Sequence, residues 1–179
     1  MNGFKTTLAT ASLLALFTQG AAQAATSITD TINVSATIAA SCSISSVAAV
    51  DFGTNYNPSN TSPTYAGGGI TIACVKGTHP TIALSGGNSP DAVTGVRRMT
   101  NTSVPGEVLS YSLFKPTGVA FTCTQTETET WGASGLAVFD PGPASGFGET
   151  TFNICGKIDA RQDVITGTYT DQVIATITF

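Results

Sequence analysis

The sequence is poor in charged residues, because Asp, Glu, Lys and Arg make up 10% of its 179 residues. Its formal net charge of −4 leaves no excess of basic side chains for binding a nucleic acid or an anionic membrane surface. We therefore predict no nucleic-acid partner. A surface built largely from Thr, Ser, Asn and Gly suits an extracellular protein that buries much of its area against neighbours.

Residues that could carry catalysis are also scarce. His79 is the one histidine, and no nucleophile-elbow motif accompanies it. Asp159, Asp163 and Asp171 are spaced too irregularly for an EF-hand loop. The glycines at residues 67–69 are not followed by the Lys-Ser/Thr of a phosphate-binding loop. These absences predict a protein that is not an enzyme and has no cofactor.

After residue 25 no apolar run is long enough to span a bilayer, which predicts no membrane insertion. The first 24 residues have a different pattern. Lys5 precedes an apolar run at residues 8–17, and the small residues Ala22 and Ala24 follow it. The run is too short for a transmembrane helix, so residues 1–24 are interpreted as a secretory signal peptide. Its removal takes Lys5 away and leaves a more acidic chain, about the size of one domain.

The four cysteines of this exported chain predict two disulfides. A zinc site is disfavoured, because the sequence has no CxxC pair and a single histidine. Three pairings are open, and the sequential one closes two loops of similar size. The four residues are Cys42, Cys74, Cys123 and Cys155.

No segment after the leader has a helical period. Short runs with apolar–polar alternation are separated by Gly-, Pro- and Asn-rich turns, a pattern typical of an all-β sandwich or barrel. We expect one domain without internal repeats. The expected strands are residues 28–38, 70–75, 81–84, 109–114, 136–139, 151–154 and 168–179.

The two ends of the mature chain both alternate, which raises the question of pairing between chains. At the N-terminal end, in residues 28–38, apolar residues occupy the even positions and polar residues the odd ones, with Asp30 as the one exception. These apolar residues are Ile28, Ile32, Val34, Ala36 and Ile38. At the other end the alternating apolar residues are Val173, Ala175, Ile177 and Phe179.

An ordered set of short motifs resembles the spore coat protein U domain, the fold of subunits in archaic chaperone–usher pili. Each motif is weak alone, but together they span essentially the whole mature chain. They are Cys42, Phe52-Gly53, Ile70-Thr71-Ile72-Ala73-Cys74, Gly77, Ala83-Leu84-Ser85-Gly86-Gly87, Arg98-Met99, Leu109-Ser110-Tyr111-Ser112-Leu113, Trp131-Gly132, Gly156-Lys157-Ile158 and Gly167-Thr168-Tyr169-Thr170-Asp171.

The resemblance implies an incomplete immunoglobulin-like β-sandwich with an N-terminal donor strand. In such pilins a periplasmic chaperone first fills the open groove. At the outer-membrane usher, the extension of the next subunit replaces the chaperone strand. The implied organisation is a signal peptide at 1–24, a donor extension at 25–38 and a sandwich domain at 39–179. The even apolar residues of the extension would be the inserted side chains, and Val173, Ala175, Ile177 and Phe179 would face the groove.

Several alternatives remain open. Residues 26–38 could instead form the first strand of their own domain. The function that the resemblance favours is a structural pilin that polymerises by donor-strand exchange, secreted through the periplasm to a surface pilus used in adhesion and biofilm formation. Alternatively it is a spore or cell-surface coat protein, or a minor tip or adaptor subunit that binds a ligand.

The second cysteine pair is an addition to the family pattern, because the simplest members carry the first pair only. A bridge between Cys123 and Cys155 would tether residues 122–131, either as a contact loop or as a stabilising device. We expect Trp131 in the core, and not in a glycan site.

Overall fold

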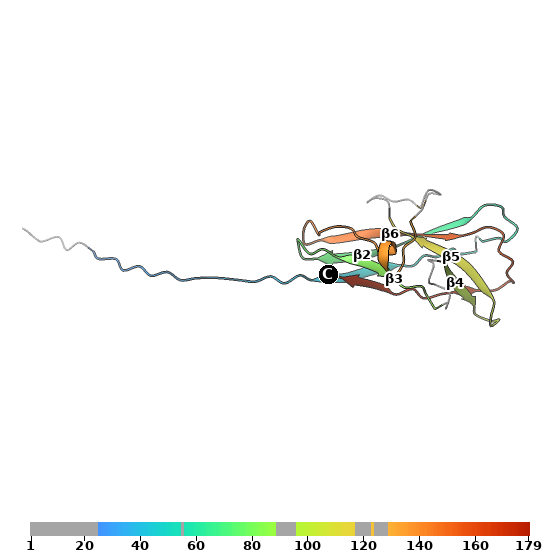
Figure 1. Ribbon diagram of the computed structural model, residues 1–179, viewed down its shortest axis with the longest axis horizontal. Helices are drawn as coiled ribbons and strands as arrows, with labels where there is room; N and C mark the ends of the chain where they lie inside the picture. The colour runs from blue at the N-terminus through green and yellow to red at the C-terminus, as the bar shows by residue number, and fades with distance from the viewer. Residues whose placement is uncertain (1–24, 55, 89–95, 117–122, 124–128) are drawn as a thin grey trace, which may run out of the picture. The chain divides into compact units, whose positions relative to one another are not determined.

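The computed structural model describes residues 25–54, 56–88, 96–116, 123 and 129–179, so the expected signal peptide and most of the expected contact loop lie outside it. Two compact units are distinguished, Met1–Thr37 and Ile38–Phe179. The second contains all the strands of the described residues (Figure 1). They are β1 (Cys42–Ala48), β2 (Thr64–Cys74), β3 (Thr81–Leu84), β4 (Val96–Asn101), β5 (Val108–Phe114), β6 (Glu149–Ile158), β7 (Tyr169–Thr170) and β8 (Ala175–Thr178).

The described strands form two antiparallel sheets. The larger has the order β1-β2-β6-β5-β4-β7, and the smaller consists of β3 and β8. At its centre, β2 and β6 pair over ten positions, from Thr64↔Ile158 to Ala73↔Glu149. In the smaller sheet, Thr81 lies opposite Thr178 and Leu84 opposite Ala175. Figure 1 shows β3 beside the C-terminal strand.

The core lies between the two sheets, and the alternation of the sequence places it there. Every second residue is buried in β3, in β5 and in the second half of β2, because side chains of a strand point alternately to its two faces. These buried residues are Ile70, Ile72, Cys74, Ile82, Leu84, Leu109, Tyr111 and Leu113. The all-β fold expected from the sequence is thus confirmed.

Residues 136–139 were expected as a strand, and this expectation was wrong. The structure has a 3₁₀ turn, Gly135–Ala137, which begins after Ser134. Gly135 has φ +57°, a left-handed conformation that ends the extended path before the turn. Phe139 then forms an isolated bridge with Ile82. Short apolar runs do not distinguish strands from other buried segments.

The expected strand at residues 168–179 is two strands in different sheets. Thr170 of β7 pairs with Thr100 in the larger sheet, whereas Ala175 of β8 pairs with Leu84 in the smaller one. Two other strands, β1 and β4, were not expected. In β1 the adjacent Ser45 and Ser46 interrupt the apolar alternation, and β4 begins Val96-Arg97-Arg98, so neither sequence shows a clear period of two.

Residues 25–41 contain no strand, although residues 28–38 were expected to form one. Figure 1 shows residues 25–37 as an extended trace. A strand requires a partner for its backbone hydrogen bonds, and among the described residues the first such bond from this segment is at Ser41, whose carbonyl oxygen accepts the Val75 N–H at 2.9 Å. The alternation therefore identified a segment able to form a strand, and the structure leaves it unpaired.

Candidate strand-binding groove

The sandwich domain contains an apolar groove of about 470 Å³. Its lining comes from both sheets and from the segment that follows β1. The larger sheet contributes Ile70, Met99, Tyr111, Leu113 and Ile154, and the segment after β1 contributes Ala49, Val50, Asp51 and Phe52. The other wall includes Leu84, Val173 and Ala175.

The wall formed by β8 has one unpaired edge in the described structure. β8 pairs with β3, and no other described strand pairs with it. An exposed edge presents backbone N–H and C=O groups that can pair with another chain. An unpaired edge next to an apolar groove is the geometry needed to accept an additional strand, with backbone groups on the edge and alternate side chains in the groove.

Two glycines of the larger sheet permit a close approach of the segment after β1. A Cβ atom on Gly68 would lie 2.6 Å from Val50 Cγ2, and one on Gly156 would lie 2.7 Å from Phe52 Cζ. Both distances are shorter than carbon atoms tolerate, so any side chain here would displace this segment. The glycine run at residues 67–69 therefore has a packing role, through Gly68.

The end of the groove near β7 is polar. Tyr111 donates its hydroxyl to Asp171 Oδ2 at 2.7 Å, and both residues line the groove. Burial raises the pKa of Tyr111, and the hydrogen bond to the Asp171 carboxylate raises it further. Next to this pair, the Arg97 side chain is 1% exposed, and desolvation lowers its pKa from the usual value.

The N-terminal extension exposes the apolar side chains that the sequence placed on one face. The exposed fractions are 94% for Ile28, 88% for Ile32, 90% for Val34 and 80% for Ile38, and Ala36 is also exposed. Large apolar side chains exposed as a set indicate an interaction segment, whereas single ones do not. The even-numbered face of the extension is thus available to a partner.

The C-terminal residues expected at the groove differ in their positions. Val173 and Ala175 line it, and Ile177 is half-buried against the core. Phe179 is 55% exposed and is not among the residues that line the groove. The β3–β8 ladder ends at the pair Thr81↔Thr178, one residue before Phe179. The next residue of the partner strand is Pro80, which has no N–H with which to continue the ladder.

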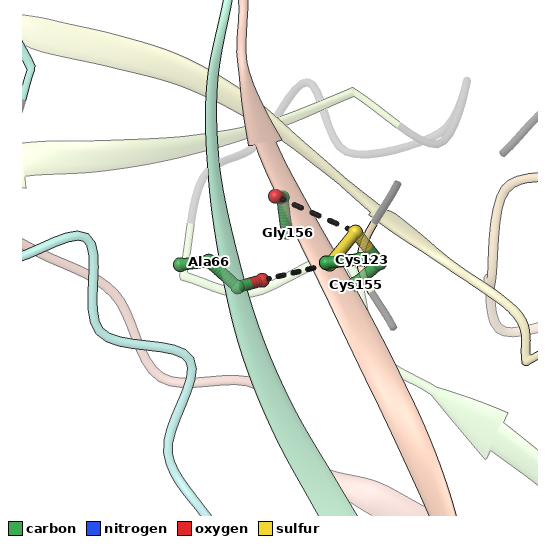
Figure 2. The surroundings of a disulfide bond; sticks show 4 residues. All are labelled: Ala66, Cys123, Cys155 and Gly156. Carbon is green, nitrogen blue, oxygen red and sulfur yellow. Dashed lines mark hydrogen bonds between the residues drawn. A yellow bond between two sulfur atoms is a disulfide. The ribbon is translucent and has the colours of Figure 1, made fainter. Parts of the chain in front are cut away.

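Both disulfides of the structure join cysteines that are sequential in the chain. Cys42 is bonded to Cys74, which lies opposite it in the β1–β2 pair. Cys123 is bonded to Cys155 of β6 (Figure 2). Cys123 Sγ lies 3.2 Å from the carbonyl oxygen of Ala66, so this bridge holds the chain after β5 against the β2–β6 pair. Neither disulfide contributes to the groove lining.

Trp131 and His79 have structural contacts. Trp131 is fully buried and donates its indole N–H to the Ile82 carbonyl oxygen at 2.8 Å, so its expected core position is confirmed. His79 is half-exposed, and its Nε2 lies 2.7 Å from Asp140 Oδ1. The pKa of Asp140 is lowered, mainly by the Gly142 backbone N–H and then by His79.

Sequence reasoning did not assign a role to Tyr111, Asp171 or the segment at residues 49–52. The alternation Leu109-Tyr111-Leu113 could have placed Tyr111 on the inner face. The contact between Tyr111 and Asp171 joins residues 60 positions apart, which no local pattern reveals.

The described part of the chain offers no other chemistry at this site. Within it, no three His, Cys, Asp or Glu side chains are grouped so that they could hold a metal ion. None of its helices is long and apolar enough to cross a membrane.

Comparisons with known proteins point to one family. The model of the Spore Coat Protein U domain matches residues 28–176. A solved structure with 25% sequence identity and a TM-score of 0.50 is the chaperone–tip adhesion subunit pre-assembly complex CsuC–CsuE, from archaic chaperone–usher Csu pili of Acinetobacter baumannii. The match covers 80% of this chain but 41% of the matched chain, less than half of its length. The comparison with curated proteins gives no match. Neither of the matched descriptions names an enzyme.

Proposed function

This chain belongs to the Spore Coat Protein U domain family, and we propose that it is a structural subunit of a chaperone–usher pilus. In this proposal each subunit inserts its N-terminal extension, residues 25–38, into the groove of a neighbour. The polymer would be extracellular and would serve in surface adhesion and biofilm formation. The sandwich domain at residues 39–179 would form the body of each subunit.

The observation that carries the proposal is the unpaired edge of β8 beside the apolar groove. Strand addition requires a backbone edge and pockets for alternate side chains, and this site offers both. The extension offers the complementary features, because its backbone is unpaired and its apolar side chains share one face. Burial of each Ile or Val side chain contributes about 1.5–3 kcal/mol, so several together can offset the cost of ordering the segment.

A groove of this kind needs a temporary occupant before assembly. We propose a periplasmic chaperone for that role and an outer-membrane usher as the site of exchange. The likeness to a chain from a chaperone–subunit complex supports the chaperone. The proposed partners are therefore a chaperone, an usher and further copies of this chain.

The test is a non-reducing gel of the purified protein in SDS, run with and without boiling. The second sample is a variant that lacks residues 25–34. We expect the full-length mature chain to give a ladder that resists SDS but collapses on boiling, and the deletion to abolish it. A wild-type chain that stays a folded monomer and gives no ladder would overturn the proposal, because the sandwich would then complete itself and accept no strand from a neighbour. A coat-protein role, which the family name records, would follow.

A further inference from the structure

The chain changes sheets in the four residues between β7 and β8, and this crossover forms part of the groove wall. Thr170 is paired in the larger sheet and Ala175 in the smaller one. Of the residues between them, Asp171 and Val173 line the groove. The position of residues 171–174 therefore sets the shape of the groove on the β8 side.

Asp171 anchors the start of this crossover. Its Oδ2 accepts the Tyr111 hydroxyl at 2.7 Å, and its Oδ1 accepts the backbone N–H groups of Asn88 at 2.7 Å and Gln172 at 2.8 Å. One carboxylate thus joins β5, the loop after β3 and the crossover itself. Gly87 permits this arrangement, since a Cβ atom there would overlap the Asp171 carboxylate.

The end of the crossover is fixed by Ser85. Ser85 donates its backbone N–H to the Ile174 carbonyl oxygen at 2.8 Å, and its Oγ accepts the Ile174 N–H at 2.9 Å. Arg97 of β4 donates in turn to the carbonyl oxygens of Leu84, Ser85 and Trp131, at 3.1, 2.8 and 2.7 Å. The loop that holds the crossover is therefore tied to the larger sheet through a buried guanidinium group.

We propose that Asp171 is a positioning residue that fixes the crossover and keeps the groove open before a strand enters it. This inference rests on the proposed function. Apolar walls without an occupant gain free energy by closing on each other, because closure removes them from water. The bonds of Asp171 oppose closure, since moving the crossover would leave a half-buried carboxylate and its donors unpaired.

Loss of the anchor has a definite kinetic consequence. If the groove is open in only a fraction of the molecules, the apparent affinity for an incoming strand is the intrinsic affinity multiplied by that fraction. This loss of affinity appears in the association rate constant. The dissociation rate constant changes little, because the bound strand itself holds the groove open. A residue that contacted the strand would instead change the dissociation rate.

The experiment measures binding of a fluorescent peptide of residues 25–38 to the mature chain. All samples carry Val34→Asp, so that the extension of the chain does not occupy the grooves. The test variants are Asp171→Asn, which keeps the size but cannot accept all three donors, and the milder Tyr111→Phe. The matched control is Gln162→Ala. Gln162 makes two hydrogen bonds with the Ser110 backbone, both at 2.8 Å, and does not line the groove.

We expect Asp171→Asn to lower the association rate constant by about tenfold or more, the scale of a lost hydrogen bond to a charged group. Tyr111→Phe should lower it less, and the dissociation rate should change little in either. Gln162→Ala should lower the melting temperature without changing association. Equal association rates for all samples would overturn this inference and leave the proposed function standing. Absence of peptide binding by the Val34→Asp parent would overturn the proposed function itself.

Discussion

The indole nitrogen of Trp131 donates a hydrogen bond to the carbonyl oxygen of Ile82, 2.8 Å away, and fixes the segment after β5 to the smaller sheet. The ring also packs against Phe139, with 5.2 Å between the ring centroids. Trp131 backbone groups take part as well, because its N–H donates to Leu113 and its carbonyl oxygen accepts from Arg97. This residue therefore links strands of both sheets.

Replacing Trp131 by Phe should lower the free energy of unfolding by about 1–3 kcal/mol, because the hydrogen bond is lost and a small cavity remains. Urea unfolding of the two proteins measures the difference. Phe147 provides a control, since it is an aromatic residue 86% exposed, and its change to Ala should alter stability by less than about 0.5 kcal/mol. Equal losses for the two variants would contradict the assigned core role.

A carboxylate on the apolar face of the extension should block polymer growth. Ile32→Asp or Val34→Asp would place an unpaired charge in an apolar groove and remove about 1.5–3 kcal/mol of favourable burial. The domain itself should still fold with its chaperone. Asn33→Asp is the matched control, because the same charge then lies on the polar face. Electron microscopy and unboiled SDS gels report the polymer, and wild-type amounts from Ile32→Asp would refute the assigned direction of this face.

The two disulfides should stabilise the domain to a similar extent, because each closes a loop with a sequence separation of 32. The chain-entropy relation gives about 3–4 kcal/mol for a loop of this length. The pairs Cys42→Ser/Cys74→Ser and Cys123→Ser/Cys155→Ser should therefore lower the free energy of unfolding by comparable amounts in urea titrations. If removal of the second pair has no effect, the stabilising role of that bridge is wrong and a contact role for its loop gains support.

Stability should fall at alkaline pH because of Tyr111. Burial and the bond to Asp171 raise its pKa in the folded protein, whereas an unfolded tyrosine ionises near pH ~10. The unfolded state therefore loses its proton first, so the stabilising contribution is complete below about pH 10 and declines as the pH rises above it. Tyr111→Phe should flatten this decline in unfolding curves recorded from pH 8 to 11. A decline of the same size in the variant would assign the effect to another group.

Much of the fold was predictable because its strands carry strong local patterns. Residues 81–84 were predicted as a strand and are β3, and the expected strand at residues 109–114 lies within β5. Both alternate apolar and polar residues, and one of their faces is buried. The family and the all-β fold, predicted from ordered motifs, are confirmed by the family match and by the likeness to the pilus-complex chain.

The sequence by itself determined the family, the all-β class, an apolar face on residues 28–38 and another on residues 173–177, because these follow from local order and a period of two residues. The tertiary structure decided which edges stay unpaired. It split the last predicted strand at Asp171, placed Tyr111 next to that carboxylate and seated Val50 over Gly68. Each of these relationships joins residues far apart in the chain. Local sequence patterns indicate which face of a strand is apolar, but the pairing of strands and the packing of the two sheets decide which residues that face contacts.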